Sequence, residues 1–321
     1  MSWLDEQLAA AGIERTGQVE QPHLRPWATL LRAPTSVGPV WLKAAAPGTA
    51  FEVPLYGLLA RTVADHVLDP IAADPARAWI LLPDGGPTLG ELKIGTDLVE
   101  SMVAALVRYG RLQRELEAHV DEILAVGVAD MRPAAMPERF GQALEAVRAT
   151  IESQGDSAGR EIYRRVAAMD QTVTSWCERL AASPVPPSLD HNDLHPWNIL
   201  DGGPGRTRYY DWGDSVVAHP FAAMLVPLGF VARGLDAELD DPRFLRARDA
   251  YLDVFTDLAP RKELIKTLEL ACRVAKIARV LTWERALHAA REQGEEVEED
   301  FATAPLQTLA SLLDEFYLGG G

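Results

Sequence analysis

The chain contains the stretch His191-Asn192-Asp193-Leu194-His195-Pro196-Trp197-Asn198, followed after a turn by Asp211-Trp212-Gly213-Asp214. These segments offer two carboxylates, Asp193 and Asp211, and one amide, Asn198. A nucleoside triphosphate carries clustered negative charge, so phosphoryl transfer needs hard oxygen ligands for Mg²⁺ and a carboxylate that orients and deprotonates the attacking hydroxyl. We therefore predict Mg²⁺-dependent phosphoryl transfer, with Asp193 as the catalytic base and with Asn198 and Asp211 as metal ligands.

Local features support a polar loop between two short strands. Apolar side chains surround the loop at Leu194 and at Ile199-Leu200, and Tyr209-Tyr210 is typical of a strand that enters the Asp211 turn. The stretch Gly202-Gly203-Pro204-Gly205 supplies the chain reversal between these segments. The sequence therefore predicts that the Asp193 loop and the Asp211 turn lie side by side.

The pattern resembles the catalytic loop and metal-binding turn of the protein-kinase-like superfamily, in which His/Arg-x-Asp-x-x-x-x-Asn precedes Asp-Phe-Gly. Trp212 occupies the position of that Phe. A second histidine, His195, with Pro196 beside it is similar to the aminoglycoside phosphotransferase and choline kinase branch, whose members phosphorylate small molecules. The resemblance implies an α+β, two-lobed protein-kinase-like fold, with a small N-terminal antiparallel β-sheet lobe carrying one helix and a large, mostly helical C-terminal lobe.

Other polar residues of the loop have structural interpretations. We interpret His191 as a residue that supports the loop, because an imidazole ring can hydrogen-bond the loop backbone. His195 either supports the loop in the same way or lies near the substrate. Asp214, which follows the predicted metal ligand, is interpreted as a cap or turn residue.

A candidate phosphate-binding lysine, Lys43, lies upstream. The segment Val40-Trp41-Leu42-Lys43-Ala44 alternates like a strand, with Trp41 and Lys43 on the same face. A helix predicted to begin near Ala50 has Glu52 in its first turn. The resemblance implies that Glu52 pairs with Lys43 and directs it toward the α- and β-phosphates. The alternative is an acid that stabilises the start of the helix through the helix dipole.

The chain has no Walker loop and no Gly-x-Gly-x-x-Gly segment after a strand, so the lysine is left to bind phosphate. Residues 19–32 predict two strands joined by residues 21–26, at the position expected for a nucleotide-covering loop. This connection contains no glycine. We interpret Arg25 as a surface arginine, with a phosphate contact as the alternative.

A short apolar strand, Ala78 to Leu82, ends in the turn Pro83-Asp84-Gly85-Gly86-Pro87. We predict that this turn is the hinge between an N-terminal nucleotide-binding lobe, residues 1–84, and a C-terminal helical lobe, residues 85–321, which carries the catalytic loop, the metal-binding turn and the acceptor site. The resemblance implies that adenine lies against the backbone near Leu81 to Asp84, with Leu82 lining the nucleotide site.

Beyond the hinge the apolar residues change from a period of two to a period of about 3.6, which indicates helices. The first of these has an apolar stripe from Leu98 to Leu116, which we interpret as core. Further helices are predicted over residues 138–150, 161–181, 220–232, 243–258, 261–291 and 303–316.

The formal net charge of −16 argues against nucleic acids and anionic membranes as partners, since both would be repelled. It favours a cationic, amine-bearing acceptor, although the acidic run at residues 295–300 is typical of a solvated segment. The N-terminus lacks the basic residues of a signal peptide, so a cytoplasmic location is expected. Cys177 and Cys272 are expected to be separate, buried and reduced thiols.

Three alternatives compete with a small-molecule kinase. A zinc or di-metal hydrolase would use the histidines and aspartates of the loop, but Asn198 would have no evident task in it. A protein kinase would carry Ala-Pro-Glu after the metal-binding turn and an arginine before the catalytic Asp193, and both are absent. A catalytically inactive nucleotide-binding scaffold would be expected to lack Lys43, Asp193, Asn198 or Asp211.

The expected activity is therefore transfer of the γ-phosphate of ATP or GTP to a hydroxyl of a small molecule, with Mg²⁺. An amine-bearing acceptor such as an aminoglycoside or amino sugar is favoured. The choice between ATP and GTP, the identity of the alcohol or amino-alcohol substrate, and the oligomeric state stay open.

Overall fold

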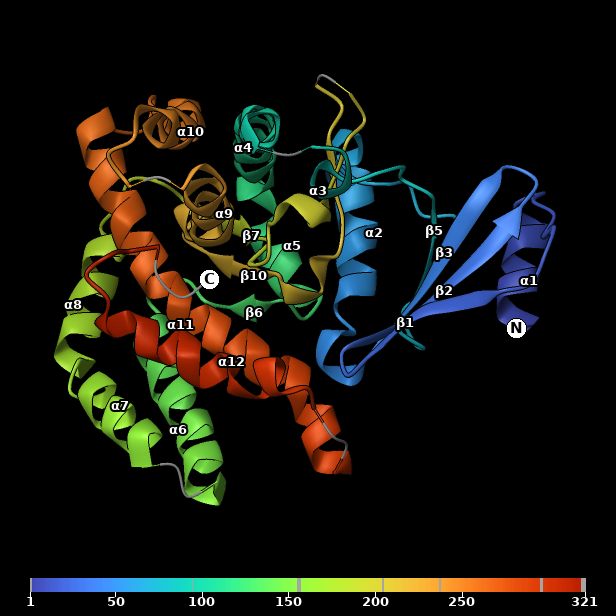
Figure 1. The fold of residues 1–321 in the computed structure, drawn as a ribbon. Coiled ribbons are helices and arrows are strands. Elements are labelled where there is room, and N and C mark those ends of the chain that lie inside the picture. The colour runs from blue at the N-terminus through green and yellow to red at the C-terminus, as the bar shows by residue number, and fades with distance from the viewer. Residues whose placement is uncertain are drawn as a thin grey trace.

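The computed structural model describes residues 2–93, 95–154, 157–203, 205–236, 238–294 and 297–318. Its N-terminal part is built on a five-stranded antiparallel sheet with the strand order β1-β2-β3-β5-β4 (Figure 1). The strands are β1 (Glu20–Arg25), β2 (Ala28–Thr35), β3 (Gly38–Ala45), β4 (Ala72–Asp74) and β5 (Trp79–Pro83).

The predicted connection over residues 21–26 is wrong. Strand β1 continues to Arg25, and only Pro26 and Trp27 separate it from β2. Prolines at positions 22 and 26 suggested a loop, but β1 is an edge strand, where a missing N–H is tolerated. The β1–β2 register also shifts between Glu20 and His23, which accommodates Pro22. The segment predicted to cover the nucleotide is therefore a tight hairpin.

The sheet is covered on one face by a helix that the sequence analysis did not predict, α1 (Ser2–Ala10). Its buried side chains Trp3, Leu4 and Leu8 form one apolar cluster with residues from β2, β3 and β5: Ala33, Val40, Leu42 and Leu81. Alternate residues of a strand point to opposite faces, so Ile80 and Leu82 of β5 join the other, main core.

Helix α2 (Glu52–Thr62) follows β3 and lies between the sheet and the helical part of the molecule (Figure 1). It begins within two residues of the predicted position near Ala50, and Glu52 lies in its first turn as expected. Its apolar side chains belong to the main core: Val53, Leu55, Tyr56, Leu58 and Leu59. The predicted α+β class is confirmed.

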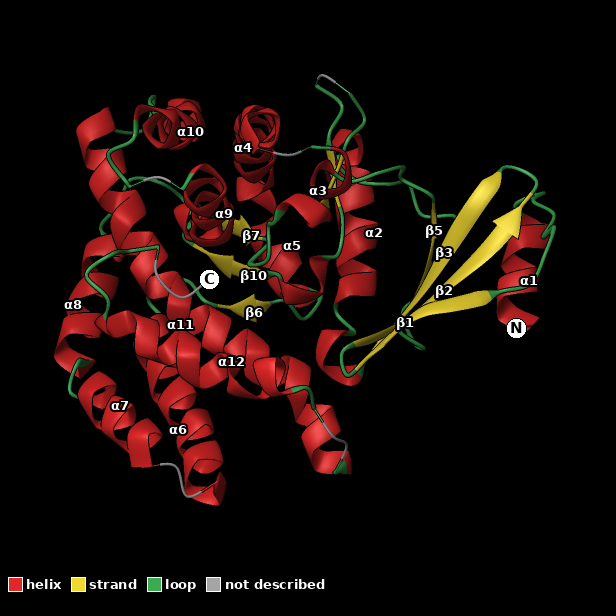
Figure 2. Cartoon of the chain, in the orientation of Figure 1, coloured by secondary structure: helices red, strands yellow, loops and turns green. Residues whose placement is uncertain are grey.

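The C-terminal part is mostly helical (Figure 2). Its helices are α3 (Leu89–Leu92), α4 (Gly95–Leu116), α5 (Val120–Ala125), α6 (Met136–Gln154), α7 (Ser157–Ala167), α8 (Asp170–Ala181), α9 (Leu225–Leu235), α10 (Pro242–Leu252), α11 (Arg261–Gln293) and α12 (Glu299–Ala310). A small sheet contains β6 (Ala129–Asp130), β10 (Val216–Ala218) and β7 (Ser188–Asp190), and a two-stranded ladder pairs β8 (Ile199–Leu200) with β9 (Arg208–Tyr209).

Several predicted helices differ from the structure. Residues 220–224 form a short 3₁₀ helix before α9, and the helix expected over 243–258 ends at Leu252, as α10. Residues 161–181 are not one helix, because α7 ends at Ala167 and α8 begins at Asp170. Charged residues mark this break. Arg164 and Arg165 stabilise the last turn of α7, and Asp170 stabilises the first turn of α8, through the helix dipole. The helix expected over 303–316 begins and ends earlier, as α12, with acidic Glu299 and Asp300 in its first turn.

The predicted core stripe of α4 is confirmed from Met102 to Leu116, and two polar residues on the same helix are also buried. The Tyr109 hydroxyl accepts a hydrogen bond from the His191 backbone N–H at 2.8 Å and donates to the carbonyl of Leu189 at 3.2 Å. The Gln113 amide also donates to the Leu189 carbonyl, at 3.1 Å. Helix α4 therefore fixes β7, the strand that leads into the Asp193 loop.

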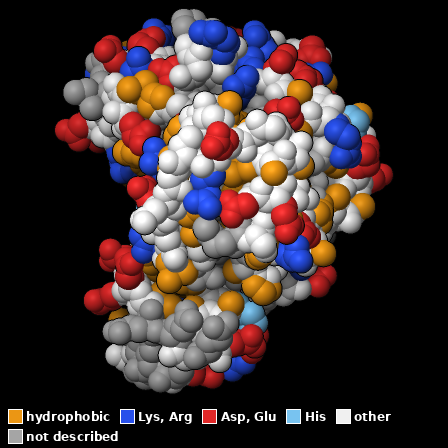
Figure 3. Space-filling model, turned by 90° about the vertical axis from the view of Figure 1, so that its right-hand side faces the viewer, with side chains coloured by type: hydrophobic (Ala, Val, Ile, Leu, Met, Phe, Trp, Pro, Cys, Tyr) orange, Lys and Arg blue, Asp and Glu red, His pale blue; other side chains and the backbone are white. Residues whose placement is uncertain are grey.

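No helix in the described part of the chain is long and apolar enough to cross a membrane. Cys177 and Cys272 are buried and free, as predicted. Acidic and basic side chains are interspersed on the molecular face that includes the N-terminal sheet (Figure 3). The net negative charge therefore does not form one continuous patch on that face.

Replacing Tyr109 with Phe is expected to reduce the free energy of unfolding by about 1–3 kcal/mol, because the His191 N–H loses its buried acceptor. Urea unfolding at an unchanged m value measures this loss. Tyr163→Phe on α7 is the matched control and should change stability little, because that side chain is only half-buried and lies outside the network. Equal effects of the two substitutions would contradict the assigned role of Tyr109.

Candidate active site

The Asp193 loop starts with an unusual backbone conformation. Asn192 has a φ of 60°, in the left-handed region that Asn adopts more readily than most residues. Its N–H donates to the Asp190 carboxylate at 2.6 Å, and its side-chain amide donates to the Thr282 hydroxyl at 2.8 Å. These bonds hold the backbone reversal that turns Asp193 away from strand β7.

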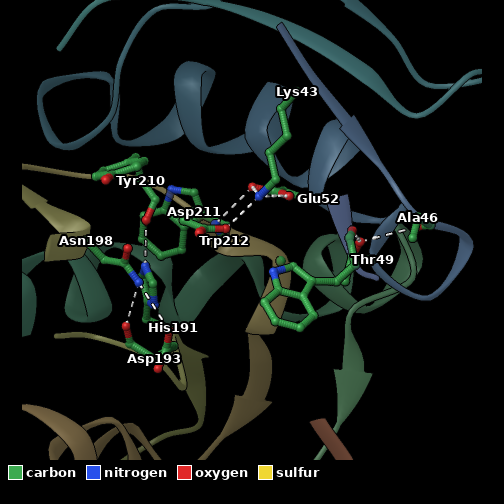
Figure 4. A network of polar contacts seen from close by, with 12 residues as sticks. Lys43, Ala46, Thr49, Glu52, His191, Asp193, Asn198, Tyr210, Asp211 and Trp212 are labelled. Carbon is green, nitrogen blue, oxygen red and sulfur yellow. Dashed lines mark hydrogen bonds and ion pairs between the residues drawn. The ribbon is translucent and has the colours of Figure 1, made fainter. Parts of the chain in front are cut away.

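Asn198 closes the other end of this loop. Its amide nitrogen donates to the Asp193 carbonyl at 2.9 Å and lies 3.3 Å from the Asp193 carboxylate (Figure 4). The amide nitrogen is thereby directed at the loop, and the amide oxygen is left as the group that can bind a cation. The five-residue spacing between Asp193 and Asn198 thus lets the Asn198 amide close the loop on Asp193.

The Asp211 turn lies against this loop. Asp211 itself has a φ of 62°, which makes it the second left-handed residue of the site. The Tyr210 N–H donates to the Asn198 carbonyl at 3.3 Å, and the His191 ring nitrogen Nε2 lies 2.9 Å from the Tyr210 carbonyl. The predicted side-by-side arrangement of loop and turn is therefore present.

Lys43 reaches this turn from the N-terminal sheet. Its Nζ lies 2.7 Å from one oxygen of Glu52 and 2.5 Å from Asp211 (Figure 4). The other Glu52 oxygen accepts a hydrogen bond from the Trp212 N–H at 3.1 Å. The predicted Lys43–Glu52 pair is thus present, and Glu52 also bonds the backbone of the Asp211 turn.

Charge neighbours control ionisation in this buried site. Burial disfavours the Lys43 ammonium, but the carboxylates of Asp211 and Glu52 outweigh it and raise the Lys43 pKa above its ordinary value. Burial likewise opposes ionisation of Asp193, yet the Arg279 guanidinium and His195 lower its pKa far below the usual range. The lysine is held as a cation and Asp193 as an anion at neutral pH.

The two histidines both contact the loop. His191 is fully buried, and its ring packs 4.8 Å from that of Trp212. His195 Nε2 lies 3.4 Å from the Asp193 carboxylate, and its ring packs against Trp197 and Phe230. His191 therefore lies where a loop-supporting residue would, and His195 lies both against the loop and on the wall of the site.

Helix α11 supplies residues that the sequence analysis missed. Arg279 donates to the Asn192 carbonyl and lies 2.9 Å from the Asp193 carboxylate. Further along the same helix, Arg285 donates to the Gly213 carbonyl at 3.0 Å. No local pattern of the helix shows which segments these two arginines touch, so only the fold identifies these contacts.

Asp214 lies in a short turn, as predicted, but the structure adds a feature. The residue lines the same cavity as Asp193, and burial raises the pKa of its carboxyl to about 7. The nearby Asp193 carboxylate also raises the pKa of Asp214, because two neighbouring carboxylates resist double ionisation.

Two adjoining cavities meet at Lys43 and Asp211. The larger, of about 410 Å³, includes Leu82 and Asn198 in its wall, together with Leu30, Trp41, His195, Trp197 and Tyr210. The smaller, of about 80 Å³, is lined by Asp193, Asp214, Arg279, Thr282 and Trp283. Trp27, at the tip of the β1–β2 hairpin, lines both cavities.

Arg25, the alternative phosphate contact, is paired with an acidic side chain in the structure. It lies on the wall of the larger cavity and pairs with Glu298 at 2.7 Å. Glu298 belongs to the acidic run that was expected to be solvated; positions 295 and 296 of that run lie outside the described residues. At least one acid of the run therefore contacts the hairpin.

The donor set fits a hard divalent cation. Asp211 and the free amide oxygen of Asn198 line the same cavity and are the oxygen ligands that Mg²⁺ prefers. Among the described residues, no group of three or more His, Cys, Asp or Glu side chains is arranged to hold a metal ion, as the hydrolase alternative would require.

The two-lobed arrangement and this site define the class of a kinase-like phosphotransferase. The model of the phosphotransferase enzyme family APH matches residues 93–264, which is more than half of the 321 residues. The chain therefore belongs to this family, and the resemblance described above is confirmed. Comparison with curated proteins gave no match.

Solved structures share the fold at low sequence identity. Macrolide 2′-phosphotransferase MphH from Brachybacterium faecium superposes with a TM-score of 0.57 and 20% identity, over 96% of this chain and 98% of the other. Choline kinase LicA from Streptococcus pneumoniae gives 0.59 and 16%, over 97% and 98%. An ethanolamine kinase from Plasmodium vivax gives 0.59 and 12%, over 93% and 82%.

Replacing Lys43 with Met is expected to lower the free energy of unfolding by about 3–5 kcal/mol at neutral pH, because it leaves the buried Glu52 carboxylate and the half-exposed Asp211 beside it without their cation. Burial already raises the pKa of Glu52, and loss of Lys43 raises it further. The folded variant then binds a proton that the unfolded chain lacks, so its stability falls as the pH rises. Denaturant unfolding at about pH 5 and pH 8 should show the larger deficit at pH 8.

Lys93→Met provides the control, since Lys93 pairs with Asp201 at 3.7 Å in a more exposed position. Its loss should cost less than about 1 kcal/mol at either pH. A Lys43 variant with no pH-dependent deficit would show that its carboxylate partners are solvated in the folded protein.

Proposed function

We propose that this protein transfers the γ-phosphoryl group of ATP or GTP to a hydroxyl of a small molecule. One observation carries the proposal: Lys43, Asp193, Asn198 and Asp211, which come from separate parts of the chain, surround two adjoining cavities. Membership of the phosphotransferase enzyme family supports it.

Each residue then has a defined task. Lys43 binds the phosphates, and Glu52 keeps its ammonium directed toward them. Asp193 orients the acceptor hydroxyl and takes its proton as the acceptor oxygen bonds to the γ-phosphorus and the nucleoside diphosphate leaves. Bound Mg²⁺, held by Asn198 and Asp211, would neutralise the phosphate charge that develops during transfer.

The larger cavity is the proposed nucleotide site. Its wall combines apolar side chains, Leu30 and Leu82, with the phosphate-directed Lys43. We propose that adenine lies against the chain near Leu82 and that residues 1–84 and 85–321 are the two lobes, with the segment between β5 and α3 as the hinge. The hydrogen bond from the Asp84 N–H to the Pro39 carbonyl at 3.1 Å supports this boundary, because it anchors the end of β5 to the sheet.

The smaller cavity is the proposed acceptor site, because Asp193 lies in its wall. Three aspartates line it, Asp193, Asp211 and Asp214, against two cationic groups, Lys43 and Arg279. Two of the similar structures are named for choline and ethanolamine, each of which carries a cationic nitrogen and a hydroxyl. We propose an amine-bearing alcohol as the acceptor here.

Asp211→Ala is expected to weaken metal-dependent nucleotide binding, because it removes an anionic oxygen ligand. Asp193→Asn should leave that binding largely intact and lower turnover by about 10²- to 10⁴-fold, the usual effect of a positioned general base. Thermal shift with ATP or GTP, with and without EDTA, measures binding, since a ligand that binds only the native state raises its stability.

The unchanged protein sets the reference for this comparison. If neither nucleotide raises its melting temperature, the kinase proposal fails. A nucleotide shift without turnover on any acceptor would instead indicate a nucleotide-binding scaffold. Equal loss of nucleotide affinity in both variants would contradict the division of roles between Asp193 and Asp211.

The acceptor proposal predicts a salt effect. If acids attract the ammonium group of the acceptor, ordinary salt screens the attraction, so KM for the acceptor should rise with ionic strength while kcat changes little. ATP consumption with amino sugars, aminoglycosides and amino alcohols, compared with neutral sugars and nucleosides, measures the preference. Phosphorylation of neutral acceptors with equal efficiency would leave a kinase without amine selectivity.

A further inference from the structure

Helix α11 contacts both functional segments through one face. Thr282 accepts a hydrogen bond from Asn192 at 2.8 Å, Arg279 contacts the Asn192 carbonyl and the Asp193 carboxylate, and Arg285 donates to the Gly213 carbonyl. Helix α11 therefore holds both the Asp193 loop and the Asp211 turn in position. Helix α11 is the longest helix of the described chain, at 33 residues, which suits it to this task.

Arg279 is the central contact on this face. Its side chain is only 12% exposed, and its guanidinium lies 5.6 Å from the centre of the Trp283 ring, which limits its movement. One nitrogen of its planar guanidinium donates to the Asn192 carbonyl, and the other donates to the Asp193 carboxylate. This geometry fixes the carboxylate in position and orientation, which a flexible ammonium cannot reproduce with equal precision.

Contacts to both oxygens hold the Asp193 carboxylate in place. One Asp193 oxygen faces Arg279 at 2.9 Å, while the other lies 3.3 Å from the Asn198 amide and 3.4 Å from His195. Rotation of the carboxylate would break contacts on both sides. Arg279 also keeps Asn192 in its left-handed conformation, because it binds the carbonyl that this conformation presents.

We propose that Arg279 is a positioning residue for phosphoryl transfer, which holds the Asp193 carboxylate in line with the acceptor hydroxyl. This inference rests on the proposed function. In the step that it serves, the acceptor O–H gives its proton to Asp193 as its oxygen bonds to the γ-phosphorus. The bond from that phosphorus to the β,γ-bridging oxygen breaks, and the nucleoside diphosphate leaves.

The test uses ATP with Mg²⁺ and water as the acceptor, so that the slow release of inorganic phosphate reports the transfer step without an identified alcohol. Arg279→Ala should lower kcat by about 10²-fold, the effect of misplacing a reacting group by about 1 Å, and leave KM for ATP unchanged. Arg279→Lys should give an intermediate rate. Lys266→Met, an exposed position on the same helix, should match the unchanged protein.

A double substitution separates positioning from a general structural role. If Arg279 acts through Asp193, adding Arg279→Ala to Asp193→Asn should cause no further loss of kcat, because the carboxylate is already gone. Free guanidinium at low concentration should partly restore Arg279→Ala but not the double variant.

Several outcomes overturn the inference. They are an unchanged kcat in Arg279→Ala, a further loss in the double variant, or a fall in nucleotide-induced thermal stabilisation that parallels the fall in rate. If Arg279→Ala does not fold, Arg279→Lys carries the same comparisons. Failure of the proposed function gives a different result, because neither ATP nor GTP would then raise the melting temperature of the unchanged protein.

Discussion

The ion cluster of Lys43, Glu52 and Asp211 is the contact on which the arrangement of the two parts of the molecule depends. Lys43 comes from the N-terminal sheet, Glu52 from α2 and Asp211 from the C-terminal part. The Lys43 ammonium and the Glu52 carboxylate, both largely buried, are costly to bury separately, and their attraction offsets this cost only at close range. The cluster therefore specifies one relative position of sheet and loop more sharply than apolar packing can.

Buried hydrogen bonds extend this order from the cluster into the core. Glu52 binds the Trp212 N–H, His191 contacts the Tyr210 carbonyl, and Tyr109 accepts from the His191 N–H. Each link satisfies a polar group that would otherwise be desolvated without a partner. The apolar core supplies most of the stability, while this chain of polar contacts determines where the reactive groups lie.

The sequence predicted the parts of the site that follow one another closely along the chain. Asp193 and Asn198 interact within one loop, and the alternation of residues 40–44 placed Lys43 on the face of Trp41, where both line the larger cavity. Leu82 also lies in that wall. These placements could be predicted because motif spacing and strand periodicity are local properties.

Contacts that depend on tertiary packing could not be predicted in this way. Arg279 lies 86 residues from Asp193 in the chain, and its helix shows only an ordinary amphipathic pattern. Helix α1 was missed for a related reason, since its nine residues gain their stability from the sheet beneath them. The break between α7 and α8 was missed because apolar periodicity continues across it, although the charges at the two ends mark it.

The contact between the β1–β2 hairpin and the C-terminal helix has a consequence for motion. The ring of Phe301 on α12 packs 5.3 Å from that of Trp27, and Arg25 pairs with Glu298 just before the same helix. An exposed ion pair and one aromatic contact are together worth about 1–2 kcal/mol. Separating the hairpin tip from α12 therefore costs only a modest free energy, while the rest of the hairpin stays paired with β3. The part of the larger cavity's wall formed by Arg25 and Trp27 is thereby supported by a segment more than 270 residues away in the chain.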